Sequence, residues 1–295
     1  GAERYMQGIL IGASSMAKGN LAVVENRLHY IGTDGKEYYI QGTPIGSATL
    51  YPDAHPETTS VDADVQRTDV AETWAQIIAG AGTLANDYAT AIDCTRFGYI
   101  EAPPQSGWDD LGRGFVLFDG SILPSNPVVT SAELVLYSAT KYDGGGWLPN
   151  VNIYNVFANY PASNIAIVAG DFIGIGTTPY CDNPIAYADW NIIDGANTFT
   201  LNAAGRAMIT SGIIKIGIRN ANYDVAGVEP SPSHNSAYVR CWSAEKGGTL
   251  RPKLIINYVP GPYSLNPPGN IAVVETRIHY VATNWYEMYL QGALV

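Results

Sequence analysis

Cysteines are scarce in this sequence and lie far apart. Three occur in 295 residues, Cys94, Cys181 and Cys241. This number and spacing exclude a dense disulfide framework, and no CxxC pair indicates a metal site. Two alternatives stay open: three reduced, buried thiols, or one disulfide with one leftover thiol.

Positive charge and long apolar runs are also lacking. The chain has 16 Lys and Arg against 27 Asp and Glu, and the resulting net charge of −11 would repel a phosphate backbone. No basic cluster offsets it, so we expect no nucleic-acid partner. Apolar runs fall far short of the ~20 residues of a membrane-spanning helix, so we expect no membrane span. Charged residues are only 15%, whereas 31 Gly, 18 Pro and 20 Tyr favour turns and strands.

The chain contains a duplicated module. Residues Gly19 to Gly42 (GNLAVVENRLHYIGTDGKEYYIQG) align without a gap with Gly269 to Gly292 (GNIAVVETRIHYVATNWYEMYLQG), and 14 of the 24 positions are identical. A third, partial copy opens the chain, because ERYMQG at residues 3–8 matches EYYIQG at residues 37–42. Since this copy supplies only the last strand of a repeat, we expect the chain to be part of a longer or processed polypeptide.

Each full copy reads as a three-stranded meander. Leu21 to Val24, Arg27 to Ile31 and Glu37 to Gln41 have strand character, and Asp34-Gly35 has the chemistry of a tight turn. The second copy has Asn284-Trp285 instead, a turn that would present Trp285 to a partner. About 24 residues bury no core alone, so the repeats are predicted to make subunit contacts. The apolar residues assigned to assembly are Leu21, Val23, Leu28, Tyr30, Ile271, Val273, Ile278, Tyr280 and Trp285.

The repeats bracket a region of different composition. The predicted organisation is a partial repeat and linker (1–18), a repeat (19–46), a central domain (47–259), a Pro-rich linker (260–268) and a repeat (269–295). Alternating, β-branched segments predict central strands at 114–118, 132–138, 150–157, 213–219, 237–242 and 253–258. Two short helices are predicted, near 163–169 and at 202–209. Many short strands between Gly, Pro and Asn turns indicate an all-β sandwich.

Four stretches of the central region together resemble one family. They are YPDAHPETTSVDADVQR (51–67), GRGFVLFDGSILP (112–124), SAELVLYS (131–138) and AYVRCWSAEKGGTLRPKLIINY (237–258). They are similar to jelly-roll domains of the DNRLRE type, which are related to carbohydrate-binding modules and recur in bacterial surface and phage structural proteins. The resemblance implies a two-sheet jelly roll whose final strand returns beside the first, and a role in building or decorating surfaces. The eponymous motif has no clear match here. The flanking modules look similar to short β-repeats of phage tail fibres and other virion-associated proteins.

Two binding sites follow from residue types. Aromatic residues in predicted loops, with Trp147 after three glycines, would form a sugar-stacking platform or else close the ends of the core; the candidates are Trp108, Tyr142, Trp147, Tyr187 and Trp190. Acidic residues near the start of the sandwich have the oxygen ligands that Ca²⁺ prefers. Since the resemblance also implies a structural calcium, Asp62 and Asp64 are its candidate ligands, and no other cofactor is indicated.

The sequence indicates no enzyme. It contains no GxSxG elbow, HExxH helix or P-loop, and Asp109, Asp110 and Glu133 are as readily solvated loop acids as glycosidase carboxylates. The leading prediction is therefore a structural subunit of a phage virion, as a tail fibre or decoration protein, or of an extracellular filament. Its partners would be copies of itself, other virion or filament proteins, or a cell-surface glycan. The alternatives are a carbohydrate-binding module of a bacterial surface protein or secreted enzyme, and a polysaccharide depolymerase.

Overall fold

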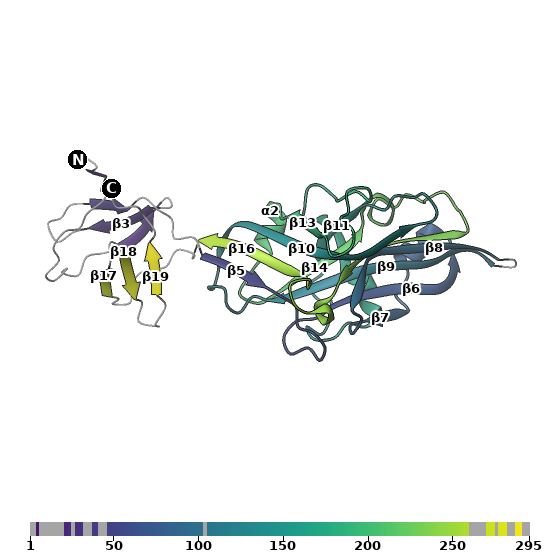
Figure 1. Cartoon of the computed structure of the whole chain (residues 1–295), viewed down its shortest axis with the longest axis horizontal. Helices are drawn as coiled ribbons and strands as arrows, with labels where there is room; N and C mark the ends of the chain where they lie inside the picture. The colour runs from purple at the N-terminus through teal and green to yellow at the C-terminus, as the bar shows by residue number, and fades with distance from the viewer. Residues whose placement is uncertain are drawn as a thin grey trace. The chain divides into compact units, whose positions relative to one another are not determined.

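The chain divides into a central unit and a flanking unit. The central unit comprises Ser47–Ser125 and Val129–Asn257. The computed structural model describes residues 46–102 and 105–259 continuously, and outside them the backbone of seven short strands (Figure 1). Cys94, Cys181 and Cys241 are all buried free thiols, which resolves the alternative left open by the sequence. Among the described residues, no helix is long and apolar enough to cross a membrane.

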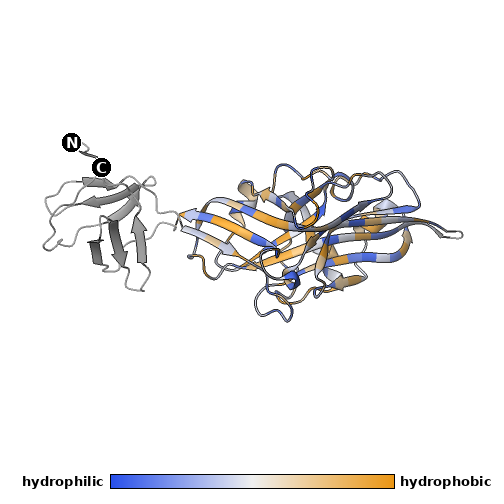
Figure 2. Ribbon diagram, in the orientation of Figure 1, coloured by the Kyte–Doolittle hydropathy of each residue, from blue (hydrophilic) through white to orange (hydrophobic). Residues whose placement is uncertain are grey.

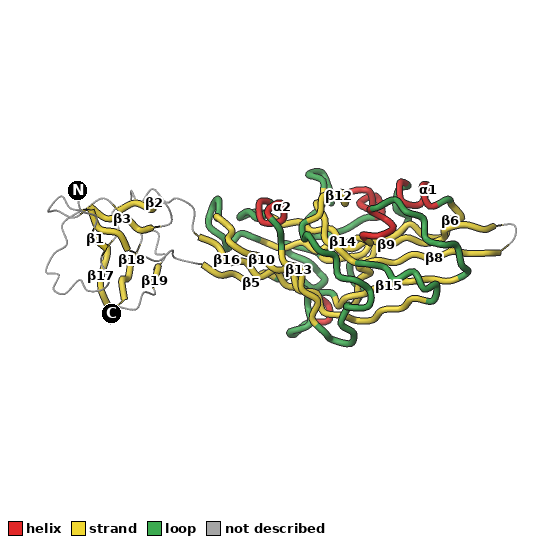
Figure 3. Tube along the Cα trace, turned by 90° about the horizontal axis from the view of Figure 1, so that it is seen from above, coloured by secondary structure: helices red, strands yellow, loops and turns green. Residues whose placement is uncertain are grey.

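Strands dominate the central unit, and the all-β class predicted from the sequence is confirmed (Figure 3). A 12-stranded sheet has the order β12-β11-β14-β9-β8-β15-β10-β16-β5, with β6 pairing β9 and β7, and β13 pairing β10. The strands are β5 (Gly46–Leu50), β6 (Asp62–Glu72), β7 (Leu84–Asn86), β8 (Ala91–Ala102), β9 (Gln105–Asp119), β10 (Val128–Asp143), β11 (Val151–Val156), β12 (Ile175–Pro179), β13 (Ala196–Thr200), β14 (Ile213–Asn220), β15 (Asn235–Trp242) and β16 (Lys253–Val259).

The first and last strands of this sheet are neighbours. β16 lies beside β5, as expected for a final strand that returns beside the first. The two strands run in opposite directions, so the chain enters and leaves this sheet at the same end (Figure 1).

The six predicted strands all occur, but one predicted helix is wrong. Residues 163–168 are irregular, and a 3₁₀ helix follows at η1 (Ala169–Gly174). The second prediction is confirmed by α2 (Ala203–Ala207), where the Asn202 side chain caps the helix by accepting from Gly205 N at 3.0 Å. A further helix, α1 (Trp74–Ala79), begins with a capping box in which Thr73 N donates to Gln76 Oε1 at 3.0 Å.

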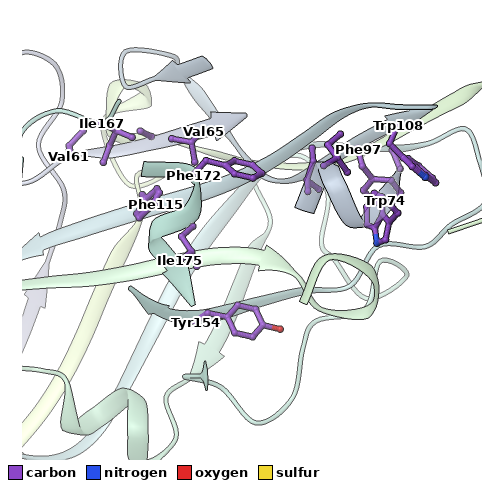
Figure 4. Packing of buried hydrophobic residues seen from close by; sticks show 14 of the residues in the cluster. Val61, Val65, Trp74, Phe97, Trp108, Phe115, Tyr154, Ile167, Phe172 and Ile175 are labelled. Atoms are coloured by element: carbon purple, nitrogen blue, oxygen red, sulfur yellow. The ribbon is translucent and has the colours of Figure 1, made fainter. Parts of the chain in front are cut away.

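The core combines aliphatic strand residues with a cluster of aromatic rings. Along the long strands, apolar and polar bands alternate, as expected when successive side chains face opposite sides of a sheet (Figure 2). Trp74 of α1 packs against Phe97 and Trp108 with ring centroids 5.9 and 4.7 Å apart (Figure 4). Trp147 also contacts Phe97, at 5.1 Å. These rings anchor α1 and the loop after β10 to the sheet.

A buried ion triad crosses the core. Asp224, in a single π-helical turn (Ala221–Val225), accepts from Arg113 Nη2 at 2.7 Å and from Arg219 Nη2 at 2.6 Å. Burial alone would raise the pKa of Asp224, but the two guanidinium groups outweigh it and lower that pKa to about 2. Arg113 also donates to the carbonyl of Phe172 at 2.8 Å, so the triad links β9, β14 and η1.

The repeats form two small sheets with matching registers. The first sheet has the order β1-β4-β3-β2, from β1 (Arg4–Tyr5), β2 (Leu21–Val24), β3 (Arg27–Ile31) and β4 (Glu37–Ile40). The second has β17 (Asn270–Val274), β18 (Arg277–Val281) and β19 (Glu287–Leu290). Leu21 opposes Tyr30 and Leu28 opposes Ile40, and the residues 250 positions later pair identically. The predicted meander is therefore present in both copies.

Candidate functional site

Strand β15 presents a row of aromatic and cationic side chains on its outer side. Its residues are alternately buried and partly exposed, so that Ala237, Val239 and Cys241 enter the core. Tyr238, Arg240 and Trp242 therefore share the opposite face.

The neighbouring strands extend this row. On one side, Tyr142 of β10 opposes Tyr238, and the two rings stack with centroids 5.5 Å apart. Tyr142 is 44% exposed, so ring surface remains open to solvent. On the other side, β8 places Arg96 opposite Tyr238 and Asp93 opposite Arg240. We call Tyr142, Tyr238, Arg240, Arg96 and Trp242 the aromatic–arginine face.

Cations lie directly over two of these rings. Arg240 Cζ is 4.8 Å from the Tyr238 ring centroid, and Lys246 Nζ is 4.0 Å from that of Trp242. Trp242 Nε1 also donates to Asp194 Oδ1 at 2.6 Å. These contacts hold the rings in fixed orientations, which reduces the conformational entropy that a ligand must remove on binding.

Buried carboxylates underlie the two arginines. Arg240 Nε donates to Asp93 Oδ1 at 2.5 Å, and Arg96 Nε donates to Asp110 Oδ2. Gln66 Nε2 bridges Asp64 Oδ2 at 2.7 Å and Asp93 Oδ2 at 3.1 Å. The side chains of this layer connect β6, β8, β9 and β15, so they fix the positions of both guanidinium groups.

Burial changes the proton affinity of this layer. It raises the pKa of Asp64 to about 7, with a further contribution from the charge of Asp93. It raises the pKa of Asp110 to about 6 despite the opposing charge of Arg96, and it also raises the pKa of Asp93. Asp64 and Asp93 are 3% and 2% exposed, so they are too enclosed to act on a bound polymer.

Three of the five predicted sugar-stacking residues lie in the core. Trp108, Trp147 and Trp190 are at most 4% exposed, so for these three residues the core alternative holds and the sugar-stacking platform does not. Each indole N–H has an internal acceptor. Trp108 donates to Glu229 Oε1 at 2.8 Å, Trp147 to the Ser231 carbonyl at 2.8 Å and Trp190 to Ser138 Oγ at 3.0 Å. Large aromatics with satisfied N–H groups are favourable core residues, which explains their positions.

The two predicted tyrosines do not lie together. Tyr142 belongs to the aromatic–arginine face, whereas the Tyr187 ring is 4.7 Å from Lys141 Nζ. Lys141 and Tyr142 are consecutive in β10, so their side chains point to opposite sides of the sheet. Tyr238, Arg240 and Arg96 were not predicted, although the alternation in NSAYVRCW places Tyr238 and Arg240 on one face.

The predicted calcium ligands have different partners. Asp62 Oδ2 accepts from Ala244 N at 2.9 Å, and burial with the nearby charges of Glu245 and Glu57 raises the pKa of Asp62 well above its usual range. Asp64 instead faces Gln66 and Asp93. Within residues 46–101 and 106–259, where side chains are described, no three His, Cys, Asp or Glu residues are grouped as a metal site requires. Asp62 and Asp64 therefore do not fit a shared calcium ion.

Of the candidate glycosidase acids, Glu133 lies apart from Asp109 and Asp110. Asp110 is on β9 and Glu133 on β10, and β8 and β15 lie between these strands. Asp109 is partly exposed, and burial together with the charge of Asp69 raises its pKa. Glu133 therefore does not form a close carboxyl pair with either acid of β9.

The predicted assembly residues fall in the strands of the flanking unit, apart from Trp285. Leu21 and Val23 are in β2, Leu28 and Tyr30 in β3, Ile271 and Val273 in β17, and Ile278 and Tyr280 in β18. Trp285, and the turns at 34–35 and 284–285, lie outside the described residues. For these strands, backbone pairing is described and side-chain surroundings are not.

Comparisons with known proteins assign no family. No protein-family model matches the chain, and no curated protein matches it. Among solved structures, the VP2 subviral particle of infectious bursal disease virus is similar with a TM-score of 0.18 and 13% identity, over 82% of this chain and 70% of that chain. A TM-score this low carries no argument. The family resemblance of the central region remains a prediction.

Proposed function

We propose that this chain is a non-catalytic structural subunit of a virion, as a tail fibre or decoration protein, or of an extracellular filament. In this role the repeats mediate assembly, and the central unit is exposed on the surface for adhesion. The observation that supports it is the duplicated meander, whose strand register repeats in β2–β4 and β17–β19.

The physical reason is the small size of each meander. Two or three short strands are marginally stable in water, and a module of about 24 residues buries too little apolar surface to fold alone. A chain with the same meander on both sides of its central unit can use each copy to pack against other copies of the chain or against partner proteins. Copies of the chain are the simplest such partners, because each already carries two matching modules.

Particle size tests this role directly. The full chain and a variant limited to residues 46–259 are compared by light scattering and electron microscopy. We expect the full chain to form oligomers or filaments, and the shortened chain to remain monomeric. A full chain that stays monomeric at the concentrations reached in a particle would contradict the proposal.

A second candidate function, carbohydrate binding, is favoured by the aromatic–arginine face. The faces of Tyr142 and Tyr238 suit the apolar faces of sugar rings, while the partly exposed Arg96 and Arg240 supply donors for hydroxyl groups. Because each arginine is already neutralised by an aspartate, the face is suited to neutral rather than anionic glycans.

A glycan array followed by calorimetry tests this function. Tyr142→Ala and Tyr238→Ala should each weaken binding by about fivefold, since one aromatic contact contributes on the order of 1 kcal/mol. Tyr88, which is 69% exposed and lies outside the face, provides the matched control Tyr88→Ala. Equal loss in all three variants would refute a role for the face, and release of reducing sugar would refute the non-catalytic assignment.

A further inference from the structure

Three strands of the flanking unit share one sequence pattern. β1, β4 and β19 lie in the segments ERYMQG (3–8), EYYIQG (37–42) and EMYLQG (287–292). Glu, Tyr, Gln and Gly occupy the same positions in all three, and the position after Tyr is Met, Ile or Leu. The three strands are therefore equivalent third strands of the repeat.

Two of these equivalent strands pair with each other. β1 runs parallel to β4, with Arg4 opposite Tyr38 and Tyr5 opposite Tyr39. Each residue thus lies opposite its own counterpart in the next copy of the repeat. Parallel, in-register pairing of like segments matches every backbone group to an equivalent one, as in stacked cross-β strands.

The equivalent edge of β19 is open within the described residues. β19 ends the sheet β17-β18-β19, and no described strand occupies the position that β1 has beside β4. β1 likewise ends its sheet, so its second edge is open among the described strands. Residues 287–292 contain no Lys or Pro, the residues with which proteins commonly protect such edges. Among the described strands, each of the two sheets therefore ends in a third strand whose outer edge is unpaired.

We infer that β19 of one copy pairs with the open edge of β1 in a second copy, parallel and in register, with Tyr5 opposite Tyr289. This inference rests on the proposed assembly function and specifies its contact. The two edges belong to different strands, so the contact is heterologous: every added copy presents the same two edges again, and the assembly extends end to end. β1 would then lie between two parallel third strands, β4 of its own chain and β19 of its neighbour.

Cysteine cross-linking between separate chains tests the contact. One protein carries Tyr5→Cys and a size tag, the other carries Tyr289→Cys, and the two are mixed and oxidised. Adjacent strands are about 4.8 Å apart, which a disulfide can span. The native thiols are buried, so they provide a low background. We expect a mixed dimer on a non-reducing gel, and a ladder of multimers when both substitutions are in one chain.

Register is tested with a matched partner. Glu287→Cys, two residues from Tyr289 along β19, should cross-link to Tyr5→Cys at least fivefold less efficiently. Equal efficiency would refute the specific register. Cross-linking of the doubly substituted chain without any increase in size, together with no mixed dimer, would show that β1 and β19 pair within one chain and would overturn the inference.

The remaining outcomes separate the inference from the function on which it rests. If light scattering shows oligomers that require the flanks, but Tyr5→Cys and Tyr289→Cys do not cross-link, the contact is wrong and the assembly function stands. If the full chain forms no oligomer, both are wrong.

Discussion

Replacing Asp224 by asparagine should strongly destabilise the central unit. The substitution keeps the shape of the side chain but leaves Arg113 and Arg219 buried without their shared counter-charge. Removing one partner of a buried ion pair costs about 3–5 kcal/mol, which is a large part of the stability of a typical domain. We therefore expect Asp224→Asn to lower the free energy of unfolding by about that amount at pH 7, measured by urea denaturation followed by circular dichroism.

The loss of stability caused by Asp224→Asn should also depend on pH. The pKa of Asp224 in the folded chain, about 2, lies below its usual value of 3.8. Its contribution is therefore complete above pH 4 and is lost as pH falls towards 2, by on the order of 2 kcal/mol. The difference between wild type and Asp224→Asn should shrink over this interval, because the wild-type carboxylate becomes protonated.

A partly exposed ion pair provides the control. Arg67 and Glu72 are 17% and 20% exposed, so Glu72→Gln should cost less than about 1 kcal/mol. The reasoning fails if Asp224→Asn costs no more than Glu72→Gln, or if the difference from wild type stays constant between pH 4 and pH 2.

Three further outcomes are expected. Because the pKa of Asp64 is raised to about 7, its folded form retains a proton that the unfolded chain loses above about pH 4. Asp64→Asn should thus raise the free energy of unfolding at pH 8, by up to about 4 kcal/mol, and have little effect at pH 4; a decrease at pH 8 would contradict this. Cys94, Cys181 and Cys241 should react with a thiol reagent only after unfolding, and rapid reaction in the native protein would contradict their burial. A variant of residues 46–259 should melt cooperatively by calorimetry, whereas a broad, non-cooperative transition would show that the central unit depends on its flanks.

Sequence pattern predicted the strands whose apolar residues alternate or form runs. Segments such as 213–219 and 253–258 combine β-branched residues with clear turn boundaries, and they became β14 and β16. β6 and β8 were missed because both place aspartates inside the protein: Asp62, Asp64 and Asp93 are nearly fully buried. From sequence alone, a polar residue within a strand resembles a loop residue, because its hydrogen-bonding partners are not yet known. Those partners, Ala244 for Asp62 and Arg240 for Asp93, are distant in sequence.

The candidate site was only partly predictable for a related reason. Tyr142 was identified as an accessible aromatic, but its stacking partner Tyr238 lies 96 positions later, and their contact depends on the register between β10 and β15. For the tryptophans, residue type alone left both a sugar-stacking platform and core packing open, and the burial of Trp108, Trp147 and Trp190 decides for the core. By contrast, Thr73 and Gln76 form a readable helix start, so α1 was within reach of the sequence.

The adjacent, oppositely directed β5 and β16 determine how a stretched assembly would respond. Tension applied to the chain on either side of the central unit pulls these two strand ends apart from the same end of the sheet. The hydrogen bonds between them are then loaded one after another, as in a zipper, rather than all at once in shear. If such an assembly were stretched, β5 and β16 would separate first, before the aromatic cluster and the Asp224 triad are loaded.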